Sequence, residues 1–133
     1  MADAVGSVRV GPLSRPESLQ RLQLVRAGVP EPALNVRVED RAGRLISMAD
    51  LSWPEYRVLL EYEGDGHRTS RTKFLSDMTR GENYADGGWF PMRSHAGYVF
   101  GNPNELTRRV ARRLSERGWR APTQLRHVAA ARR

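Results

Sequence analysis

Three carboxylates stand at the ends of two neighbouring stretches that have the pattern of β-strands. Asp50 follows Ile46 and Met48 at the end of the first stretch, and Glu61 and Glu63 end the next one. Residues two apart in a strand point to the same face, about 7 Å from each other. If the strands bring these oxygens together, they suit Mg²⁺ or Mn²⁺. Such an ion would polarise a phosphodiester and lower the pKa of an attacking water.

The residues that follow Glu63 fit the same chemistry. Gly64 and Gly66 would let a backbone approach the carboxylates closely. His67 is a candidate general acid or base, because imidazole titrates near neutral pH. A histidine in such a loop is otherwise a surface residue, and Glu63 alone suits a solvated strand end.

Asp50 and Glu61 differ in how well an ordinary role explains them. An aspartate beside a turn often only stabilises the turn. Glu61 follows Val58-Leu59-Leu60, and an ionised carboxylate that enters a buried strand needs a partner or a metal. The register stays open, because pairing centred on a turn at residues 52–55 puts Asp50 nearer residues 56–57 than Glu61. A longer, bent hairpin or a curved sheet would then be needed to gather the three carboxylates.

Helices and strands that would position these groups follow from local patterns. Ser14 and Glu17 fit a capping box, which predicts a helix over residues 15–27. Alternating apolar residues predict strands at 34–38, 44–51 and 56–63, of which the third is apolar enough to be covered on both faces. Short connections favour an antiparallel meander of these three strands.

The second half of the chain predicts two more helices and a strand. A helix at 69–86 should turn Phe74, Met78 and Ala85 inward, and Gly81 weakens it by about 1 kcal/mol. A strand at 89–93, reached by this helical crossover, should lie parallel to the third strand. Pro91 within it indicates an edge strand or a broken strand. A last helix starts near Pro103 and ends at Gly118. The fold class expected is α/β, with a mixed central sheet of about four strands flanked by helices.

Composition limits the class of protein. The 133 residues suit one domain, which we expect at 14–118 after a flexible lead-in (1–13) and before a basic tail (119–133). No cysteine is present, so disulfides and thiolate metal sites are excluded, and a cytoplasmic location is the default. Without a long apolar run or a signal-peptide pattern, we expect no membrane partner. The net charge of +7, carried almost entirely by arginine, favours a polyanion such as nucleic acid, although solvated helix faces would explain it too.

A longer series of residues supports one family resemblance. In order, the chain contains Pro30-Glu31-Pro32, Leu34-Asn35-Val36, Asp50-Leu51-Ser52-Trp53-Pro54-Glu55-Tyr56-Arg57, Leu60-Glu61-Tyr62-Glu63-Gly64, His67-Arg68, Asp77, Arg80, Gly88-Trp89 and Arg93. Together with the helix at 103–114, this series resembles the very-short-patch-repair-like endonuclease domains of the PD-(D/E)XK nuclease superfamily. The resemblance implies a restriction-endonuclease-like fold and Mg²⁺-dependent cleavage of DNA.

The resemblance also assigns roles by position. Asp50 matches the aspartate of the motif, Glu61 matches its first glutamate, and Glu63 stands where the superfamily name has lysine. Glu17 matches a glutamate of the first helix that often joins the site, and His67 matches a histidine shortly after the strand. Asp50, Glu61 and Glu63 are therefore the expected metal ligands. The expected nucleic-acid contacts are Arg68, Arg71, Lys73, Arg80 and Arg93.

Some positions depart from the family pattern. Ala49 precedes Asp50 where the superfamily label has proline, and Pro91 interrupts a strand that relatives make from β-branched residues. These departures affect substrate placement more than metal binding. The sequence thus predicts a metal-dependent endonuclease. The alternative is an inactive nuclease-fold module that binds nucleic acid or a protein partner. A third hypothesis is an assembly protein whose basic tail docks on an acidic partner or on RNA. The expected partners also include a second copy of the chain, as a homodimer.

Overall fold

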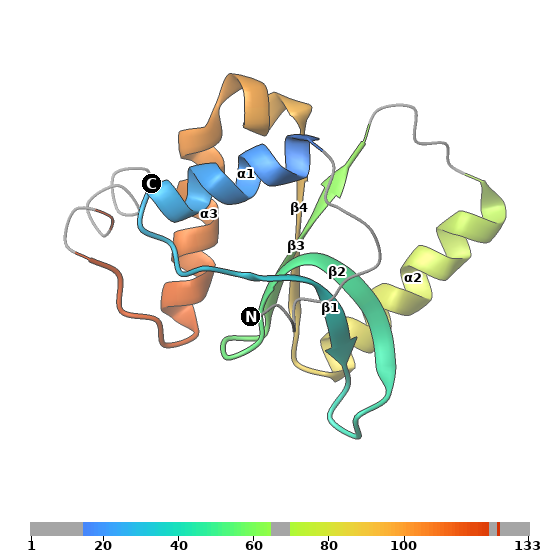
Figure 1. Ribbon diagram of the computed structural model, residues 1–133. Coiled ribbons are helices and arrows are strands. Elements are labelled where there is room, and N and C mark those ends of the chain that lie inside the picture. The colour runs from blue at the N-terminus through green and yellow to red at the C-terminus, as the bar shows by residue number, and fades with distance from the viewer. Residues whose placement is uncertain (1–14, 65–69, 123–124, 126–133) are drawn as a thin grey trace, which may run out of the picture.

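The computed structural model describes residues 15–64, 70–122 and 125, which form an α/β fold with a four-stranded mixed sheet flanked by helices on both faces (Figure 1). The predicted fold class is confirmed. The elements are α1 (Arg15–Arg26), β1 (Ala33–Glu39), β2 (Leu45–Trp53), β3 (Val58–Glu63), α2 (Arg71–Asp86), β4 (Phe90–His95), the π-helix η1 (Gly97–Gly101) and α3 (Pro103–Glu116).

The sheet has the order β1-β2-β3-β4. The first three strands form the expected antiparallel meander, and β4 lies parallel to β3 after the crossover through α2. Pro91 therefore lies in an edge strand, where a residue without a backbone N–H is tolerated. This topology makes β2 and β3 the central strands. Glu61 and Glu63 lie at the end of β3, as expected, whereas Asp50 lies inside β2 and not at its end, because β2 continues to Trp53.

The turn between β2 and β3 lies later than expected. Strand β2 continues to Trp53, and backbone bonds from Tyr56 N to Trp53 O (3.0 Å) and from Arg57 N to Pro54 O (3.2 Å) close a turn over residues 54–57. Arg57 takes a positive φ of 54° to complete it. The expected turn at 52–55 was wrong, because Ser52 and Trp53 are buried and paired within the sheet.

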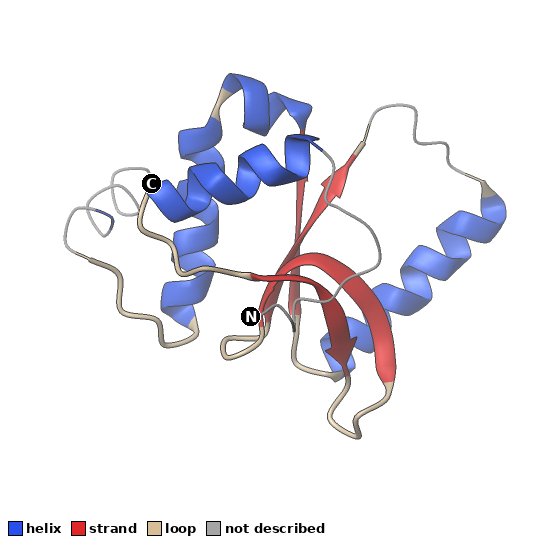
Figure 2. Ribbon diagram, viewed as in Figure 1, coloured by secondary structure: helices blue, strands red, loops and turns tan. Residues whose placement is uncertain are grey.

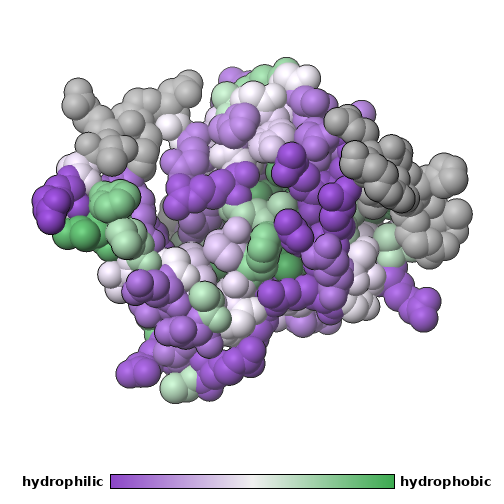
Figure 3. Space-filling model, turned by 180° about the vertical axis from the view of Figure 1, so that it is seen from behind, coloured by the Kyte–Doolittle hydropathy of each residue, from purple (hydrophilic) through white to green (hydrophobic). Residues whose placement is uncertain are grey.

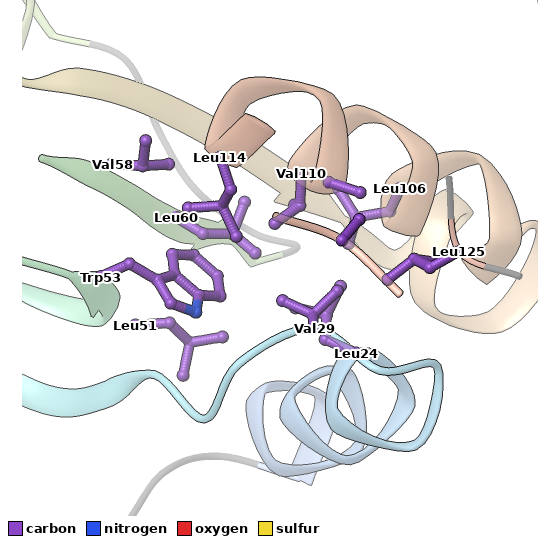
Figure 4. Close-up of a cluster of buried hydrophobic side chains, with 12 residues drawn as sticks. Leu24, Val29, Leu51, Trp53, Val58, Leu60, Leu106, Val110, Leu114 and Leu125 are labelled. Carbon is purple, nitrogen blue, oxygen red and sulfur yellow. The ribbon is translucent and has the colours of Figure 1, made fainter. Parts of the chain in front are cut away.

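The face of the sheet toward α1 and α3 carries the larger core (Figure 4). Val58 and Leu60 of β3 meet Leu51 and Trp53 of β2, and the apolar stripe of α3 closes over them. That stripe consists of Leu106, Val110 and Leu114, at the helical spacing predicted from the sequence. The core continues past the expected domain end at 118, because Trp119, Ala121 and Leu125 pack against it.

The opposite face carries a smaller core made of Val38, Ala49, Leu59, Tyr84 and Trp89. Leu59 is fully buried here while Leu60 is buried on the other side, so β3 is covered on both faces, as predicted. Helix α2 covers this face and runs outward from the sheet toward its N-terminal end (Figure 2).

The predicted inner face of α2 was wrong. Phe74 is 54% exposed and Met78 is 50% exposed, and Ala85 is exposed too. Tyr84 is the buried residue of this helix. Apolar spacing alone suggested a covered stripe, whereas α2 meets the sheet through its C-terminal part. None of the described helices combines the length and the apolar character that a membrane crossing requires.

Candidate active site

Asp50 lies where β2 separates from β3. The residue pairs between the two strands end at Leu51 and Leu60. Beyond this point the backbone N–H of Tyr62 in β3 donates to the Asp50 side chain, and Asp50 Oδ2 accepts it at 3.1 Å. Asp50 is therefore next to Glu61 in the register, and no longer hairpin is needed to bring the two carboxylates near each other.

Glu17 of α1 joins Asp50 from the helical side. It lies in the first turn of the helix, and its side chain is hydrogen-bonded to the Asp50 carboxyl group. A hydrogen bond between two carboxyl groups requires that one of them carry a proton. Burial, together with the charges of Glu17 and Glu61 and against the lowering effect of the Tyr62 N–H, raises the pKa of Asp50 to about 6. Three acids from α1, β2 and β3 thus share one electrostatic environment.

Glu61 is held by an aromatic hydroxyl from α2. The Tyr84 hydroxyl donates to Glu61 Oε2 at 3.2 Å and lies 2.6 Å from Ser47 Oγ. Because the tyrosine proton goes to the carboxylate, the Ser47 hydroxyl is the donor in the second bond. Burial raises the pKa of Tyr84 to about 12, so this hydroxyl stays a donor over the whole physiological range. This chain of bonds orients the carboxylate that the buried strand brings to the site.

Glu63 lies two residues farther along β3 and forms an ion pair with Arg93 of β4. The register of the parallel strands places Glu61 beside Arg93 and Glu63 beside His95. Arg93 was expected to contact phosphate, and Glu63 to bind metal. In this structure each has the other as a partner at the open end of the sheet.

The remaining predicted residues lie on or near α2. Lys73 and Arg80 both pair with Asp77, at 3.4 Å and 2.5 Å, and the charge of Glu61 also acts on Arg80. Arg71 is exposed at the start of the helix. His67 and Arg68 lie outside the described residues, so their predicted roles stay predictions.

The donor set of this site suits a hard divalent ion. Within the described residues, no three histidine or acidic side chains lie close enough to form a ready-made metal site. Mg²⁺ is usually held by one or two carboxylates, with water and substrate phosphate completing its coordination. Asp50 and Glu61 satisfy that requirement, with Glu17 beside them.

Sequence reasoning missed Tyr84 and Ser47. The sequence holds no motif that joins them, because one lies on β2 and the other near the end of α2. The only local signal was the polar aromatic at the end of an amphipathic helix, since a buried tyrosine hydroxyl usually finds a partner. Only the packing of α2 against β2 and β3 shows that the partner is Glu61.

Comparison with known proteins identifies sequence relatives that match part of their own length. Two uncharacterized proteins of Mycobacterium tuberculosis, one from strain CDC 1551 / Oshkosh and one from strain ATCC 25618 / H37Rv, are each 30% identical to the chain over 98 residues. The alignment covers 74% of this chain but 36% of each relative, so the chain spans about a third of their length. No protein-family model and no solved structure matches.

Proposed function

We propose that the protein is a metal-dependent endonuclease that hydrolyses DNA phosphodiester bonds. The observation that supports this most is that Glu17 and Glu61 both act on the half-buried Asp50, whose pKa is raised to about 6 by burial and by these neighbouring acids. An acid perturbed by burial and by specific charged neighbours is typical of functional sites. A divalent cation would relieve the repulsion among these acids.

Each residue of the proposed site would have a separate role. Asp50 and Glu61 would hold Mg²⁺ or Mn²⁺, which supplies charge stabilisation at the phosphate and activates water. The Tyr62 N–H and the Tyr84 hydroxyl fix one oxygen of each ligand. Glu17, hydrogen-bonded to Asp50, is placed to orient a water or to accept its proton. The net charge of +7 favours encounter with a polyanion.

Plasmid nicking tests the proposal. Supercoiled DNA is incubated with wild type, Asp50→Asn and Glu61→Gln, in Mg²⁺, in Mn²⁺ and in EDTA. We expect metal-dependent nicking by wild type and a loss of about a hundredfold or more in both variants, since each removes a ligand charge. Glu55→Gln, which changes an exposed acid in the β2–β3 turn, is the matched control and should keep full activity. Equal nicking by wild type and Asp50→Asn would contradict the proposal.

A non-catalytic module that binds nucleic acid or a protein is the second candidate. The ion pair between Glu63 and Arg93 favours it, because it occupies an acid that the endonuclease reading counted as a ligand. Thermal unfolding with and without Mn²⁺ separates the two. A rise in Tm that disappears in Asp50→Asn supports the endonuclease, and salt-sensitive DNA binding without any metal effect supports the module.

A further inference from the structure

A groove lined with arginine lies between the edge strand β4 and helix α3. It has a volume of about 220 Å³, and its apolar side is formed by Phe90, Met92, Tyr98 and Leu106. Its polar side is formed by Arg93, Arg109, Arg112 and Arg113. Figure 3 views the molecule from behind and shows hydrophilic residues around a small hydrophobic area on that side. Three of these arginines were not among the residues predicted from the sequence.

The helix itself explains why the arginines converge. Leu106, Val110 and Leu114 turn one stripe of α3 into the core. Residues three and four apart lie on the same side of a helix, so Arg109 comes together with Arg112 and Arg113 beside that stripe. The guanidinium of Arg113 also stacks over the Phe90 ring at 4.4 Å, which fixes it across the edge of the sheet. The groove is thus a consequence of how α3 packs on β4.

The ion pairs of these arginines leave them able to bind an external anion. Arg109 pairs with Glu105 at 3.1 Å, and Arg113 pairs with Glu116 at 2.9 Å. Arg109 is 57% exposed and Arg113 is 40% exposed. A solvent-exposed pair such as Arg113–Glu116 is worth about 0–1 kcal/mol, so a phosphate can replace its carboxylate. Glu105 also pairs with Arg108, so it keeps a partner when Arg109 turns to a phosphate. The planar guanidinium fork matches phosphate geometry better than an ammonium group does.

Arg93 connects the groove with the carboxylates. It lines the groove, forms an ion pair with Glu63 and lies beside Glu61 in the register of β3 and β4. A backbone that enters the groove is therefore led along the open edge of β4 to the acidic site. A chain of phosphates carries a charge at every repeat, so one polymer can occupy the groove and reach the acidic site at the same time.

We propose that the groove between β4 and α3 binds backbone phosphates of a DNA strand, next to the phosphate that would be cleaved at the metal site of Asp50 and Glu61. The assignment of the bound strand as the one that is cut rests on the proposed endonuclease function. The binding itself does not require catalysis.

Binding of a fluorescein-labelled DNA duplex in EDTA, followed by anisotropy over a range of salt concentrations, tests the groove. The groove variant is Arg109→Gln with Arg112→Gln, two exposed residues. The matched control is Arg37→Gln with Arg44→Gln, which removes the same charge from exposed arginines of the β1–β2 hairpin that are also ion-paired. We expect the groove variant to raise the Kd about tenfold and to reduce the slope of log K against log salt by about 1.8, with the control within about twofold of wild type.

Each other result overturns the inference. Equal weakening by both double variants would mean that only net charge matters, and unchanged binding by the groove variant or no binding by wild type would exclude the groove. Tighter binding of polyglutamate than of DNA, lost in the groove variant, would assign the groove to an acidic protein segment. Nicking measured in parallel keeps the two proposals apart. Groove-dependent binding without nicking defeats only the endonuclease, and metal-dependent nicking by wild type with DNA binding unchanged in the groove variant defeats only the groove.

Discussion

Asp50 is the described carboxyl group whose pKa is raised. Its pKa is raised from 3.8 to about 6, first by burial and then by the charges of Glu17 and Glu61. A raised pKa means that the folded state disfavours the ionised form. The contribution of this group to stability is therefore complete below about pH 4 and is lost as the pH rises through about 6. At neutral pH without metal, the ionised Asp50 carboxylate therefore lowers the stability of the folded state.

Asp50→Asn should consequently stabilise the metal-free protein as the pH rises. The amide keeps an oxygen that can accept the Tyr62 N–H and removes the charge. We expect a gain of about 1 kcal/mol at pH 8 relative to wild type, after allowing for partial solvent screening, and little of this gain at pH 4. Urea unfolding in EDTA at both pH values measures it.

The control for that change is Asp77→Asn. The hydrogen bond from Arg80, followed by Lys73, lowers the pKa of Asp77, so the effect of pH has the opposite sign. This variant should lose stability at neutral pH and approach wild type as the pH falls. An Asp50→Asn difference that is the same at pH 4 and pH 8 would contradict the raised pKa.

The sequence predicted the existence of helix α2 but not the face through which it packs. It begins with Ser70 as the N-cap, whose side chain accepts the Lys73 N–H at 3.0 Å, and it ends at Asp86. Its N-terminal part leaves Phe74, Leu75 and Met78 exposed, while Tyr84 reaches Glu61. The helix therefore contacts the site through its last turns, and its earlier turns pack little against the rest of the protein.

Gly81→Ala should stabilise this helix. A Cβ at position 81 would meet no atom within 4 Å, and Gly81 has no positive φ to maintain. We expect about 1 kcal/mol of added stability, because alanine loses less backbone entropy than glycine in a helix. Chemical denaturation followed by circular dichroism measures it. Gly118→Ala is the contrasting variant, since φ there is +107° and the same substitution should destabilise.

At the scale of the whole molecule, β3 divides the interior into two cores. Val58 and Leu60 face α1 and α3, and Leu59 faces α2. All three are fully buried. The strand that carries Glu61 is thus fixed from both sides, and the helices that flank it bring Glu17 and Tyr84 to the same site.

Leu60→Ala should weaken the entire fold. Its side chain is fully buried in the larger core, and truncating such a leucine costs about 2–5 kcal/mol. The urea midpoint should fall accordingly, with tryptophan fluorescence as the readout. Leu45→Ala, at a position that is 50% exposed, should cost roughly 0.5 kcal/mol or less. Similar losses in both variants would argue against a core divided by β3.

Much of this arrangement follows from local sequence patterns. Alternation at residues 34–38, the apolar run before Glu61 and the stripe Leu106, Val110 and Leu114 predicted the strands and the last helix, since side-chain periods reflect backbone geometry. Pro91 predicted an edge strand and the helical crossover predicted a parallel one, and both are confirmed. The π-helix η1 was missed because it has no comparable periodic signal.

The sequence alone determined most of the helices and strands, the order of the meander and which acids β2 and β3 carry. The tertiary structure decided the position of the β2–β3 turn, the approach of Glu17 to Asp50, the hydrogen bond from Tyr84 to Glu61 and the arginine groove along β4. The physical reason is the distance along the chain over which each kind of interaction acts. Backbone periodicity and turn chemistry act between neighbours in the chain, whereas distances between elements depend on sheet register and on how each helix packs across the sheet.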